Sequence, residues 1–405
     1  MKIVLVTCGS RGDVQPMLAL ALALQSKGHD VLLCGPPEKI VWAHEMGCPF
    51  HPLGDDVTAF IDQMQNAHSL YPAIEFVRFV HRQIHLQFER LPAVVQGADL
   101  VIGASLTFAL ASIAETHGVA YRYIAFTPQL FQSKYHPCPV FKRQQLPLWY
   151  NAVTWALVQL VNRIGLNRII NQHRYSLGLK PTQNAWGDIL GKRPLVASDS
   201  VLAALPADRE PSGSVQTGYM HLEQPAQTSP ALDAFLAAGS APIYAGFGSM
   251  PKQDQVRCMA LVVDAARQVG CRLVIAKFWP DPWQASNDPN VFCIQKFPHL
   301  DLFPQMAAVL HHGGAGTTAT SAISGVPQVI VPHILDQFYW GHRIHQSGLG
   351  PKPIWRSRLT ANKLADAFQM VLTNATIRQT AKAVSTTIRK TDALEEAVTH
   401  LLSLE

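Results

Sequence analysis

VLHHGGAGTTATSAISGVPQVIVPHILDQ, residues 309–337, is the stretch that decides the fold of this chain. The apolar run at 307–310 predicts a buried strand, and the run at 328–331 predicts a second one. Between them lie a glycine-rich turn at 313–316 and a segment at 317–324 whose residues suit a helix. A strand, a tight turn, a helix and a second strand together form the βαβ unit of a parallel sheet.

The turn in this stretch has the features of an anion site. Glycine has no Cβ, so the backbone at Gly314 and Gly316 can approach a phosphate closely. A helix that begins directly after the turn points unpaired backbone N–H groups and its positive dipole end at the same place. Thr317 and Thr318 add hydroxyl donors at the helix start. The stretch therefore predicts a site for a diphosphate group.

The composition is that of an ordinary globular protein with two domains. The chain has 405 residues, of which 48% are hydrophobic and 15% are charged, so it can bury more than one core. The net charge of +5 is spread along the chain without a basic block, which argues against nucleic acid as a partner.

Cysteine usage and hydropathy predict a cytoplasmic protein. The seven cysteines are scattered without a CxxC pair, and several lie in apolar runs, so we expect buried, reduced thiols. The N-terminal MKIVLVTCGSRGD is typical of a first strand rather than of a secretory leader. The most apolar long run, 146–161, is short and contains polar residues, so no bilayer-spanning segment is expected.

Strand and helix patterns alternate along both halves of the chain, with Pro- and Ser-rich stretches between them. We predict two Rossmann-like α/β domains that face each other across a cleft. The N-terminal domain covers residues 1–218, a linker 219–230, and the C-terminal domain 231–385. A last helix at about 374–403 is expected to pack back, through residues 386–405, on the N-terminal domain.

Two insertions break this alternation in the first half. Residues 55–96 are long and helical, and residues 128–186 are aromatic and contain several prolines. Such insertions either line a substrate site or extend the core, and the residues alone favour neither interpretation.

A second candidate functional loop follows the first strand. Gly9-Ser10-Arg11-Gly12-Asp13 lies at the carboxyl end of that strand, where open α/β sheets bind their ligands. Its glycine spacing differs from GxGxxG, so a dehydrogenase is not favoured. From the residues alone, Asp13 is either the N-cap of a helix expected at 14–27 or a carboxylate that acts as a general base.

Four motifs together resemble the GT-B glycosyltransferases of the UDP-glycosyltransferase superfamily. They are TCGSRGDVQP, HHGGAGTT, SGVPQVIVP and the pair Asp336-Gln337, and they occur in the family's order and spacing across both halves. The similarity is to the branch that contains the antibiotic aglycone glycosyltransferases and the sterol and glycolipid glucosyltransferases. The segment GLGPKPIWRSRLTANKLADAF at 348–368 is more similar to the sterol side.

This resemblance implies a catalytic role for Asp13. Many members of the wider family have a histidine at this place, whereas the antibiotic and sterol branches have an aspartate. Asp13 is then expected to take the proton from an acceptor hydroxyl as the bond to the sugar forms. Ser10, Arg11 and Gly12 are expected to lie at the junction of donor and acceptor.

The resemblance also assigns the residues that bind the sugar donor. His312 and Ser249 are expected to contact phosphate, and Gly314, Gly316 and Thr317 to hold the diphosphate through their N–H and hydroxyl groups. Asp336 and Gln337 are expected to bind sugar hydroxyls, which favours a hexose such as glucose over a deoxysugar. His311 is expected to be structural.

The nucleotide base is less well defined by the resemblance. Plant enzymes of the family carry a Trp in a WAPQ motif that stacks on uracil, and the equivalent segment here is Lys296-Phe297-Pro298-His299. Phe297 is expected to contact the base through its backbone. Trp279 and Trp283 are candidates for the stacking face, with ordinary surface packing as the alternative. Both UDP and dTDP remain open, with UDP-glucose favoured.

Neither a metal nor a cofactor is expected. The sequence has no Asp-x-Asp or HExxH pattern, and its histidines are dispersed. The resemblance therefore implies a metal-independent single displacement with inversion at the anomeric carbon, the nucleotide sugar being a co-substrate.

The acceptor is expected to be a hydrophobic alcohol or phenol, such as a sterol, polyketide, flavonoid or glycolipid. Phe76, Phe79 and Ile84 at helical spacing, together with Trp149 and Trp155, either line its site or form an ordinary core. A peripheral membrane contact through 146–161 is a third alternative. The protein is expected to be a monomer or homodimer. A nucleotide-sugar epimerase and a non-catalytic sugar-nucleotide binding protein are the competing functions.

Overall fold

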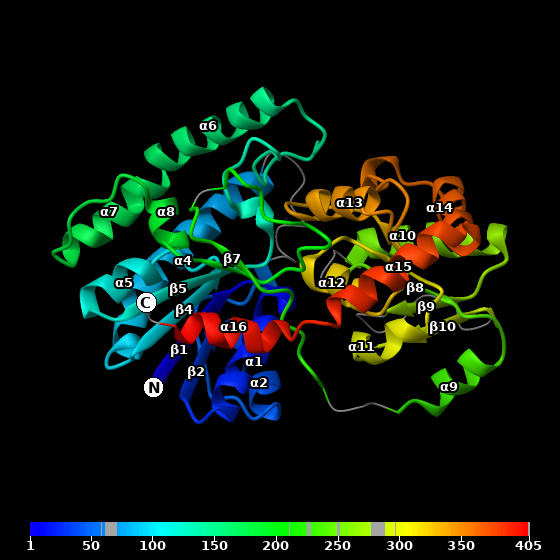
Figure 1. Ribbon diagram of the computed structural model, residues 1–405, viewed down its shortest axis with the longest axis horizontal. Helices are drawn as coiled ribbons and strands as arrows, with labels where there is room; N and C mark the ends of the chain where they lie inside the picture. Colours follow the sequence, from blue (N-terminus) through cyan, green and yellow to red (C-terminus); the bar gives the residue numbers. More distant parts are fainter. Residues whose placement is uncertain are drawn as a thin grey trace.

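Two α/β domains lie side by side in the computed structural model of the chain (Figure 1). The structure describes residues 1–57, 59–60, 71–209, 211–224, 228–248, 252–276, 288–295 and 297–403.

Seven parallel strands form the sheet of the N-terminal domain, in the order β3-β2-β1-β4-β5-β6-β7. Every residue of β1 after Lys2 is buried, as expected for a parallel sheet that is covered on both faces. The strands are β1 (Lys2–Cys8), β2 (Asp30–Gly35), β3 (Phe50–Pro52), β4 (Leu100–Ser105), β5 (Ala120–Ala125), β6 (Leu195–Val196) and β7 (Val215–Gln216).

Helices cover both faces of this sheet. One core cluster joins it to α1 and α16, and a second joins it to α4, α5, α7 and α8. The helices on this domain are α1 (Arg11–Ser26), η1 (Pro37–Lys39), α2 (Ile40–Glu45), α4 (Tyr71–Val95), α5 (Leu110–His117), η2 (Pro128–Leu130), α6 (Leu148–Ile164), α7 (Leu166–Ser176), α8 (Ala185–Leu190) and α16 (Ala393–Leu402).

The C-terminal domain has a five-stranded parallel sheet in the order β10-β9-β8-β11-β12. Its strands are β8 (Ile243–Gly246), β9 (Leu273–Ala276), β10 (Val291–Ile294), β11 (Ala308–His311) and β12 (Gln328–Ile330). Its helices are α9 (Pro230–Ala237), α10 (Lys252–Val269), α11 (His299–Leu302), η4 (Phe303–Gln305), α12 (Ala315–Ile323), α13 (Gln337–Gln346), η5 (Arg356–Arg358), α14 (Ala361–Thr373) and α15 (Ala375–Ile388).

Each sheet has one point where the strand order reverses, and ligands of open α/β sheets bind at the carboxyl ends of the strands there. In the N-terminal domain this point lies between β1 and β4, which pair with Cys8 opposite Ser105. In the C-terminal domain it lies between β8 and β11, which pair with Gly246 opposite His311. The loops that follow these four strands therefore hold the candidate site.

The chain between β7 and α9 is partly built into the structure. Met220 and Leu222 belong to the N-terminal core, and Tyr219 is buried beside α12. The segment predicted as a linker therefore begins as a packed connection rather than as an exposed one.

The end of the chain differs from the single helix predicted at about 374–403. α15 ends at Ile388, and α16 begins at Ala393 after Asp392, whose carboxylate accepts the N–H groups of Leu394 and Glu395. This cap lets the chain change direction, so that α16 packs on α1 of the N-terminal domain (Figure 1).

The two insertions contribute to the N-terminal core. Ile84, Phe88 and Leu91 of α4 pack with Ile169 and Ile170 of α7 against the sheet. For these residues the core-extending interpretation is the one that the structure supports.

Candidate active site

Asp13 lies in the first turn of α1 and not at the helix N-cap. The N-cap is Ser10, whose side chain accepts the N–H of Gly12, so the helix begins at Arg11 rather than at the predicted Val14. Asp13 is the third helical residue, and its Oδ2 accepts from the backbone N–H of Ser10 at 2.7 Å and from the Ser10 hydroxyl at 3.1 Å. This reciprocal arrangement is a capping box, and it fixes the orientation of the carboxylate.

Gly9 makes room for this carboxylate. A Cβ at residue 9 would lie 2.3 Å from Oδ2 of Asp13, which no side chain could tolerate. The glycine that follows β1 is therefore needed for the close approach of the acid to the end of the strand.

Ser105 is a third partner of Asp13 that sequence reasoning missed. Its Oγ donates to Oδ1 of Asp13 at 2.6 Å from the carboxyl end of the neighbouring strand β4. Ser105 has a φ of +59°, a left-handed conformation that is rare outside glycine. β4 extends as far as Ser105, and this length brings the hydroxyl to the loop.

The strained backbone at Ser105 is held from two sides. The phenol of Tyr123 donates to the carbonyl of Ser105 at 2.9 Å, and Nε2 of Gln87 donates to the carbonyl of Leu106 at 2.7 Å. Gln87 is fully buried on α4 and also accepts the N–H of Ala109. Backbone strain of this kind persists where surrounding contacts determine it, and it is often found at functional sites.

Burial raises the pKa of Asp13, while the hydrogen bonds from Ser105 and Ser10 act against this rise by stabilising the charged form. A carboxylate has about four lone-pair positions, and three donors occupy the side chain here. One position is thus left for a further donor, such as a hydroxyl group. A raised pKa makes the carboxylate a stronger base toward that hydroxyl.

The glycine-rich turn of the C-terminal domain leads into a helix without a side-chain cap. Gly314 is the N-cap of α12 and, as a glycine, has no side chain to accept the first N–H groups of the helix. Gly313 has a φ of +89°, and a Cβ there would lie 2.9 Å from the carbonyl oxygen of Gln337. A Cβ on Gly316 would lie 2.6 Å from the hydroxyl of Tyr219. The turn thus offers backbone N–H groups at a place where only glycine fits.

His311 shapes this turn from inside the protein. Its ring is fully buried, Nδ1 accepts the N–H of Gly313 at 3.1 Å, and Nε2 lies 2.9 Å from Oε1 of Gln328. Both ring nitrogens are engaged within the domain, which is a structural role.

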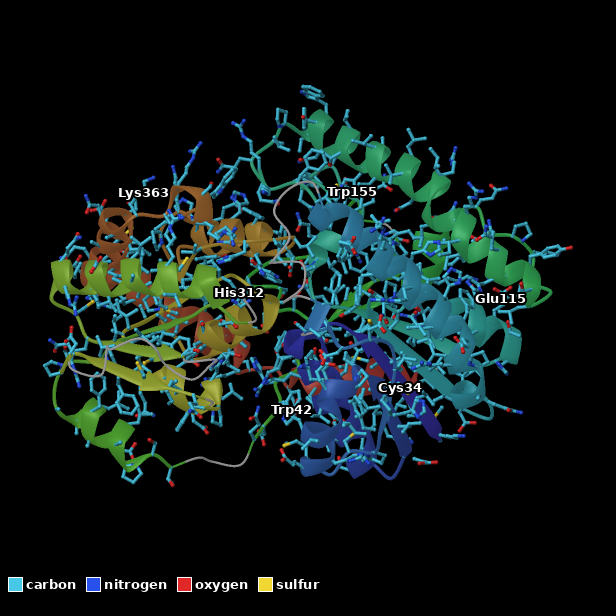
Figure 2. All side chains as sticks on the ribbon, turned by 180° about the vertical axis from the view of Figure 1, so that it is seen from behind. Cys34, Trp42, Glu115, Trp155, His312 and Lys363 are labelled. Atoms are coloured by element: carbon cyan, nitrogen blue, oxygen red, sulfur yellow. The ribbon has the colours of Figure 1, made fainter. Side chains whose placement is uncertain are left out.

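His312 differs from its neighbour because Nδ1 is buried and has no hydrogen-bond partner among the described residues. Its ring lies between two glycines: Cβ atoms on Gly248 and on Gly314 would lie 2.9 Å and 2.6 Å from it. Burial, followed by the nearby His311 and His333, lowers the pKa of His312 to about 3. The ring is therefore neutral near pH 7, with one nitrogen that donates and one that accepts. Figure 2 shows His312 near the middle of the molecule, where the domains meet.

Asp336 and Gln337 begin α13 on the same side of the C-terminal domain. Oε1 of Gln337 accepts the N–H groups of His333 and Ile334 at 2.8 and 3.1 Å, which leaves Nε2 as the end of this side chain that can donate to a ligand. Burial, and then the charge of Asp13, raises the pKa of Asp336 to about 7. Leu335, directly before this pair, has a φ of +47°.

Asp13 of the N-terminal domain lies near enough to Asp336 of the C-terminal domain for its charge to raise the pKa of Asp336. Arg11 lies on the same N-terminal loop, with its guanidinium 4.8 Å from the ring centroid of Trp42. Its charge is among the causes that lower the pKa of His299 in the C-terminal domain, after burial. The base candidate and the diphosphate turn thus come from different domains and lie at their junction.

The contact between the domains is built around α13. Leu202 and Ala203 of the N-terminal domain pack in one cluster with Tyr339 and Trp340. Nε of Arg343 donates to the carbonyl of Leu202 at 3.1 Å. The helix that carries Gln337 is therefore anchored to the opposite domain.

Several predicted donor residues are not placed by the structure. Ser249, Trp279 and Trp283 lie outside the described residues.

Phe297 packs partly buried against the C-terminal core. Thr317 lies in the first turn of α12, and its carbonyl accepts the hydroxyl of Ser321. Among the described residues, no group of three or more His, Cys, Asp or Glu side chains is placed to hold a metal ion.

Family models match both domains of the chain. Residues 3–135 match the glycosyltransferase family 28 N-terminal domain, and residues 261–404 match the erythromycin biosynthesis protein CIII-like C-terminal domain.

Relatives of known name cover nearly the whole chain. Vancomycin aglycone glucosyltransferase of Amycolatopsis orientalis is 35% identical over 99% of this chain and 97% of its own length. A dTDP-epi-vancosaminyltransferase of the same organism is 32% identical over 86% of this chain and 85% of its own. A sterol 3-beta-glucosyltransferase of Arabidopsis thaliana is 30% identical over 92% of this chain and 63% of its own.

Solved structures show the same fold at low sequence identity. The glycotransferase of kitacinnamycin has a TM-score of 0.75 at 17% identity and covers 99% of both chains. Glycosyltransferase VinC in complex with dTDP has a TM-score of 0.70 at 20% identity and covers 99% of this chain and 98% of its own.

The fold is that of the GT-B glycosyltransferases, with two Rossmann-like domains. The chain belongs to the glycosyltransferase family that includes the vancomycin aglycone glucosyltransferase, and it is a sugar-transferring enzyme. The resemblance inferred from the sequence motifs is thereby confirmed.

Proposed function

We propose that this enzyme transfers a hexose from a nucleoside diphosphate sugar to a hydroxyl of a hydrophobic acceptor, with inversion and without a metal ion. The observation that carries this proposal is the position of Asp13 at the junction with the diphosphate turn of the other domain. A base on one domain and an anion site on the other suit a donor and an acceptor that meet between them.

The reaction is a single displacement. Asp13 accepts the proton of the acceptor hydroxyl, and the hydroxyl oxygen forms a bond to the anomeric carbon of the sugar. The bond from that carbon to the diphosphate oxygen breaks, and the nucleoside diphosphate leaves with the electron pair. Because attack comes from the face opposite the leaving group, the configuration at the anomeric carbon inverts.

The C-terminal domain stabilises the leaving group. The positive end of α12 and the free N–H groups after Gly314 face the negative charge that develops on the diphosphate. The neutral ring of His312 donates one N–H to the same oxygens, since its lowered pKa of about 3 excludes the doubly protonated form at neutral pH. We assign Ser249 and Thr317 to the diphosphate on the family resemblance.

Glucose is the favoured sugar, with UDP-glucose as the favoured donor. Asp336 and Nε2 of Gln337 offer an acceptor and a donor to neighbouring sugar hydroxyls, and a deoxysugar would leave such groups unpaired. Two relatives cited above are named glucosyltransferases. A third relative is named for a dTDP-linked sugar. The nucleotide base of the donor, uracil or thymine, is therefore a question for the screen below.

The test is a screen of UDP- and dTDP-sugars against sterol, flavonoid, polyketide and glycolipid acceptors, with products read by mass. The proposal expects an acceptor-dependent product that carries one hexose, formed equally well in excess chelator. Donor conversion without an acceptor would instead support the epimerase alternative, which the comparisons do not favour. Loss of transfer in chelator would contradict the metal-independent mechanism.

A further inference from the structure

The outer face of α6 is apolar, and we define it by Trp149, Val153, Leu157, Leu160, Val161 and Ile164. These side chains recur at helical spacing, and each is between 52% and 67% exposed. Figure 1 shows α6 at the outer edge of the N-terminal domain, on the side away from α2. A surface helix of a globular protein normally directs its apolar face toward the core, whereas this apolar face is directed toward solvent.

The inner face of α6 holds the polar residues instead. Asn151 and Thr154 are each 1% exposed, and they bond to the backbone at Lys134 and Cys138. Trp155 is also buried, and its Nε1 donates to the carbonyl of His136 at 3.0 Å. The polar contacts inside explain why α6 lies in this orientation, and they leave the apolar outer face without a partner among the described residues. Trp149, a sequence candidate for the acceptor site, therefore points to solvent.

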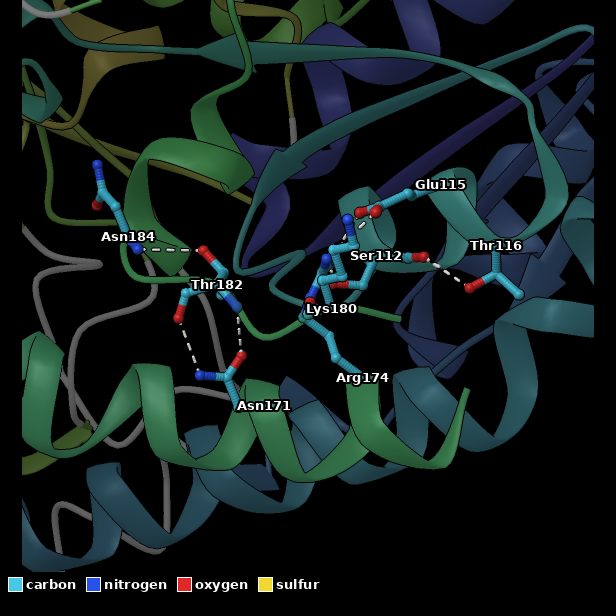
Figure 3. Close-up of polar contacts among 8 residues, drawn as sticks. All are labelled: Ser112, Glu115, Thr116, Asn171, Arg174, Lys180, Thr182 and Asn184. Carbon is cyan, nitrogen blue, oxygen red and sulfur yellow. Dashed lines mark hydrogen bonds and ion pairs between the residues drawn. The ribbon is translucent and has the colours of Figure 1, made fainter. Parts of the chain in front are cut away.

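The helix is firmly attached to the domain through its neighbour α7. Arg174 of α7 is buried and forms an ion pair with Glu115 of α5 at 2.7 Å, and Asn171 bonds to the backbone of Thr182 on both its oxygen and its nitrogen (Figure 3). The stripe is thus a fixed surface feature rather than the end of a loose arm.

The stretch of sequence that contains α6 carries charges of one sign. Between Glu115 and Asp188 the sequence contains no Asp or Glu. The same span holds exposed basic side chains, namely Lys134, Lys142, Arg143, Arg163, Arg168 and Lys180. Two nearby acidic groups are engaged: Glu115 pairs with Arg174, and Asp208 accepts from Ser133 and from the backbone of Lys134. Asp188, on α8, is exposed.

We propose that the outer face of α6 docks the enzyme onto an anionic lipid surface. An apolar stripe flanked by Lys and Arg, with Trp149 and Tyr150 at one end, has the composition of a helix that lies in a membrane interface. No described helix is long and apolar enough to cross a bilayer, so the contact is with the surface.

A second copy of the chain suits this face less well. In a two-fold dimer the same patch meets itself, so the basic rim would face a basic rim and repel it. An anionic bilayer supplies the complementary charge and an apolar layer at once.

Docking through α6 would place the active site close to the lipid surface. The loop that precedes α6 touches the donor side of the site, since His136 packs edge-on against Tyr339 at 5.7 Å and Lys142 lies over the ring of Phe338 at 5.8 Å. These aromatic residues belong to α13, the helix that begins with Gln337. This inference stands independently of the acceptor's identity.

The test is flotation of the full-length protein with phosphatidylcholine vesicles, with and without phosphatidylglycerol. The wild-type chain is expected to float with the anionic vesicles and to be released by salt. Val161→Asp should weaken this binding roughly tenfold or more, because one apolar side chain is replaced by a charge in the contact. Val41→Asp is the matched control, since Val41 is 65% exposed on α2, away from α6. This variant should bind the vesicles as the wild type does.

A second pair of variants separates the alternatives. The double variant Arg143→Glu/Arg163→Glu should lose the preference for anionic vesicles. This double variant and Val161→Asp should both keep the thermal stability of the wild type. Equal flotation of the Val161 and Val41 variants, or no flotation of the wild type, would overturn the proposal. So would a solution mass that shows a dimer for the wild type and a monomer for Val161→Asp, because α6 would then bind a second copy.

Discussion

Ser105 donates a hydrogen bond of 2.6 Å to Asp13 from a backbone with a φ of +59°. The two residues are 92 positions apart in the chain and meet because β1 and β4 are neighbours, with Cys8 opposite Ser105. A rare backbone conformation held by Tyr123 and Gln87 thus aims a hydroxyl at the proposed base. We infer that Ser105 positions this carboxylate and adjusts its pKa.

Ser105→Ala tests this positioning role. Loss of the hydroxyl removes a donor to the ionised carboxylate, so the pKa of Asp13 should rise further and the acidic limb of the pH–rate profile should move to higher pH. We expect kcat to fall about tenfold with an unchanged affinity for the nucleotide. Ser105→Gly is the matched control, since glycine lacks the hydroxyl but adopts positive φ without strain. If only the alanine variant lost activity, the backbone and not the hydrogen bond would be responsible.

His312→Ala should weaken nucleotide binding. The ring lies beside the start of α12, where Nε2 is the ring atom nearest to a Cβ built on Gly314, so a phosphate oxygen bound at this helix start can accept an N–H from Nε2. A hydrogen bond to a charged group is worth about 1.5–3 kcal/mol, which corresponds to a loss of roughly 10- to 100-fold in affinity for the nucleoside diphosphate. Calorimetric titration measures it, and an unaltered Kd would remove His312 from the phosphate site.

Asp336 predicts a pH dependence for recognition of the sugar. The pKa of this residue is raised to about 7 by burial and by Asp13, and the ionised carboxylate is the stronger acceptor for sugar hydroxyls. The affinity for the nucleotide sugar, divided by that for the free nucleoside diphosphate, should therefore increase as the pH rises through about 7. In Asp336→Asn this ratio should be lower and independent of pH. A ratio that stays constant in the wild type would separate Asp336 from the sugar.

Buried histidines predict that the fold loses stability in acid. Their pKa values are lowered by burial to between about 3 and about 4, from 6.5, so the unfolded chain binds protons that the folded chain does not. These histidines are His136, His221, His299, His311 and His312.

The raised carboxyl pKa values act in the opposite direction. They belong to Asp13, Asp199 and Asp336, and their stabilising effect is present at low pH and lost as the pH rises. Because the histidines outnumber them, stability should fall as the pH drops from about 6.5 toward about 4, by about 1.4 kcal/mol per pH unit for each net proton bound by the unfolded chain. Calorimetric Tm values across this range measure it, and a Tm that is constant or rises on acidification would contradict the expectation.

Much of the candidate site could be predicted because its residues lie in contiguous motifs. Asp13 follows the first strand directly, and His312, Gly314 and Gly316 follow another within a few residues. Residues that follow a strand within a few positions lie together at its carboxyl end, so their spacing in the sequence already predicts that they are neighbours. The order of the domains and the alternation of strands and helices were equally visible from local hydropathy.

Ser105 and α6 could not be predicted in this way. Nothing in the local pattern of residues reveals that β4 lies beside β1. The apolar run at 146–161 left three alternatives open: an ordinary buried face, an acceptor wall and a peripheral membrane contact. The orientation of α6 depends on the hydrogen-bond partners of Asn151 and Thr154. These partners lie in a loop, and the sequence of a loop has no periodic pattern from which its path could be predicted.

The most direct test of the central claim compares chemistry with binding in Asp13→Asn. Asparagine keeps the shape of the side chain and can still accept from Ser10, but it cannot take a proton. We expect transfer to fall about 10²- to 10⁴-fold while the Kd for the nucleoside diphosphate stays that of the wild type. Transfer at the wild-type rate would show that Asp13 is only a part of the capping box of α1.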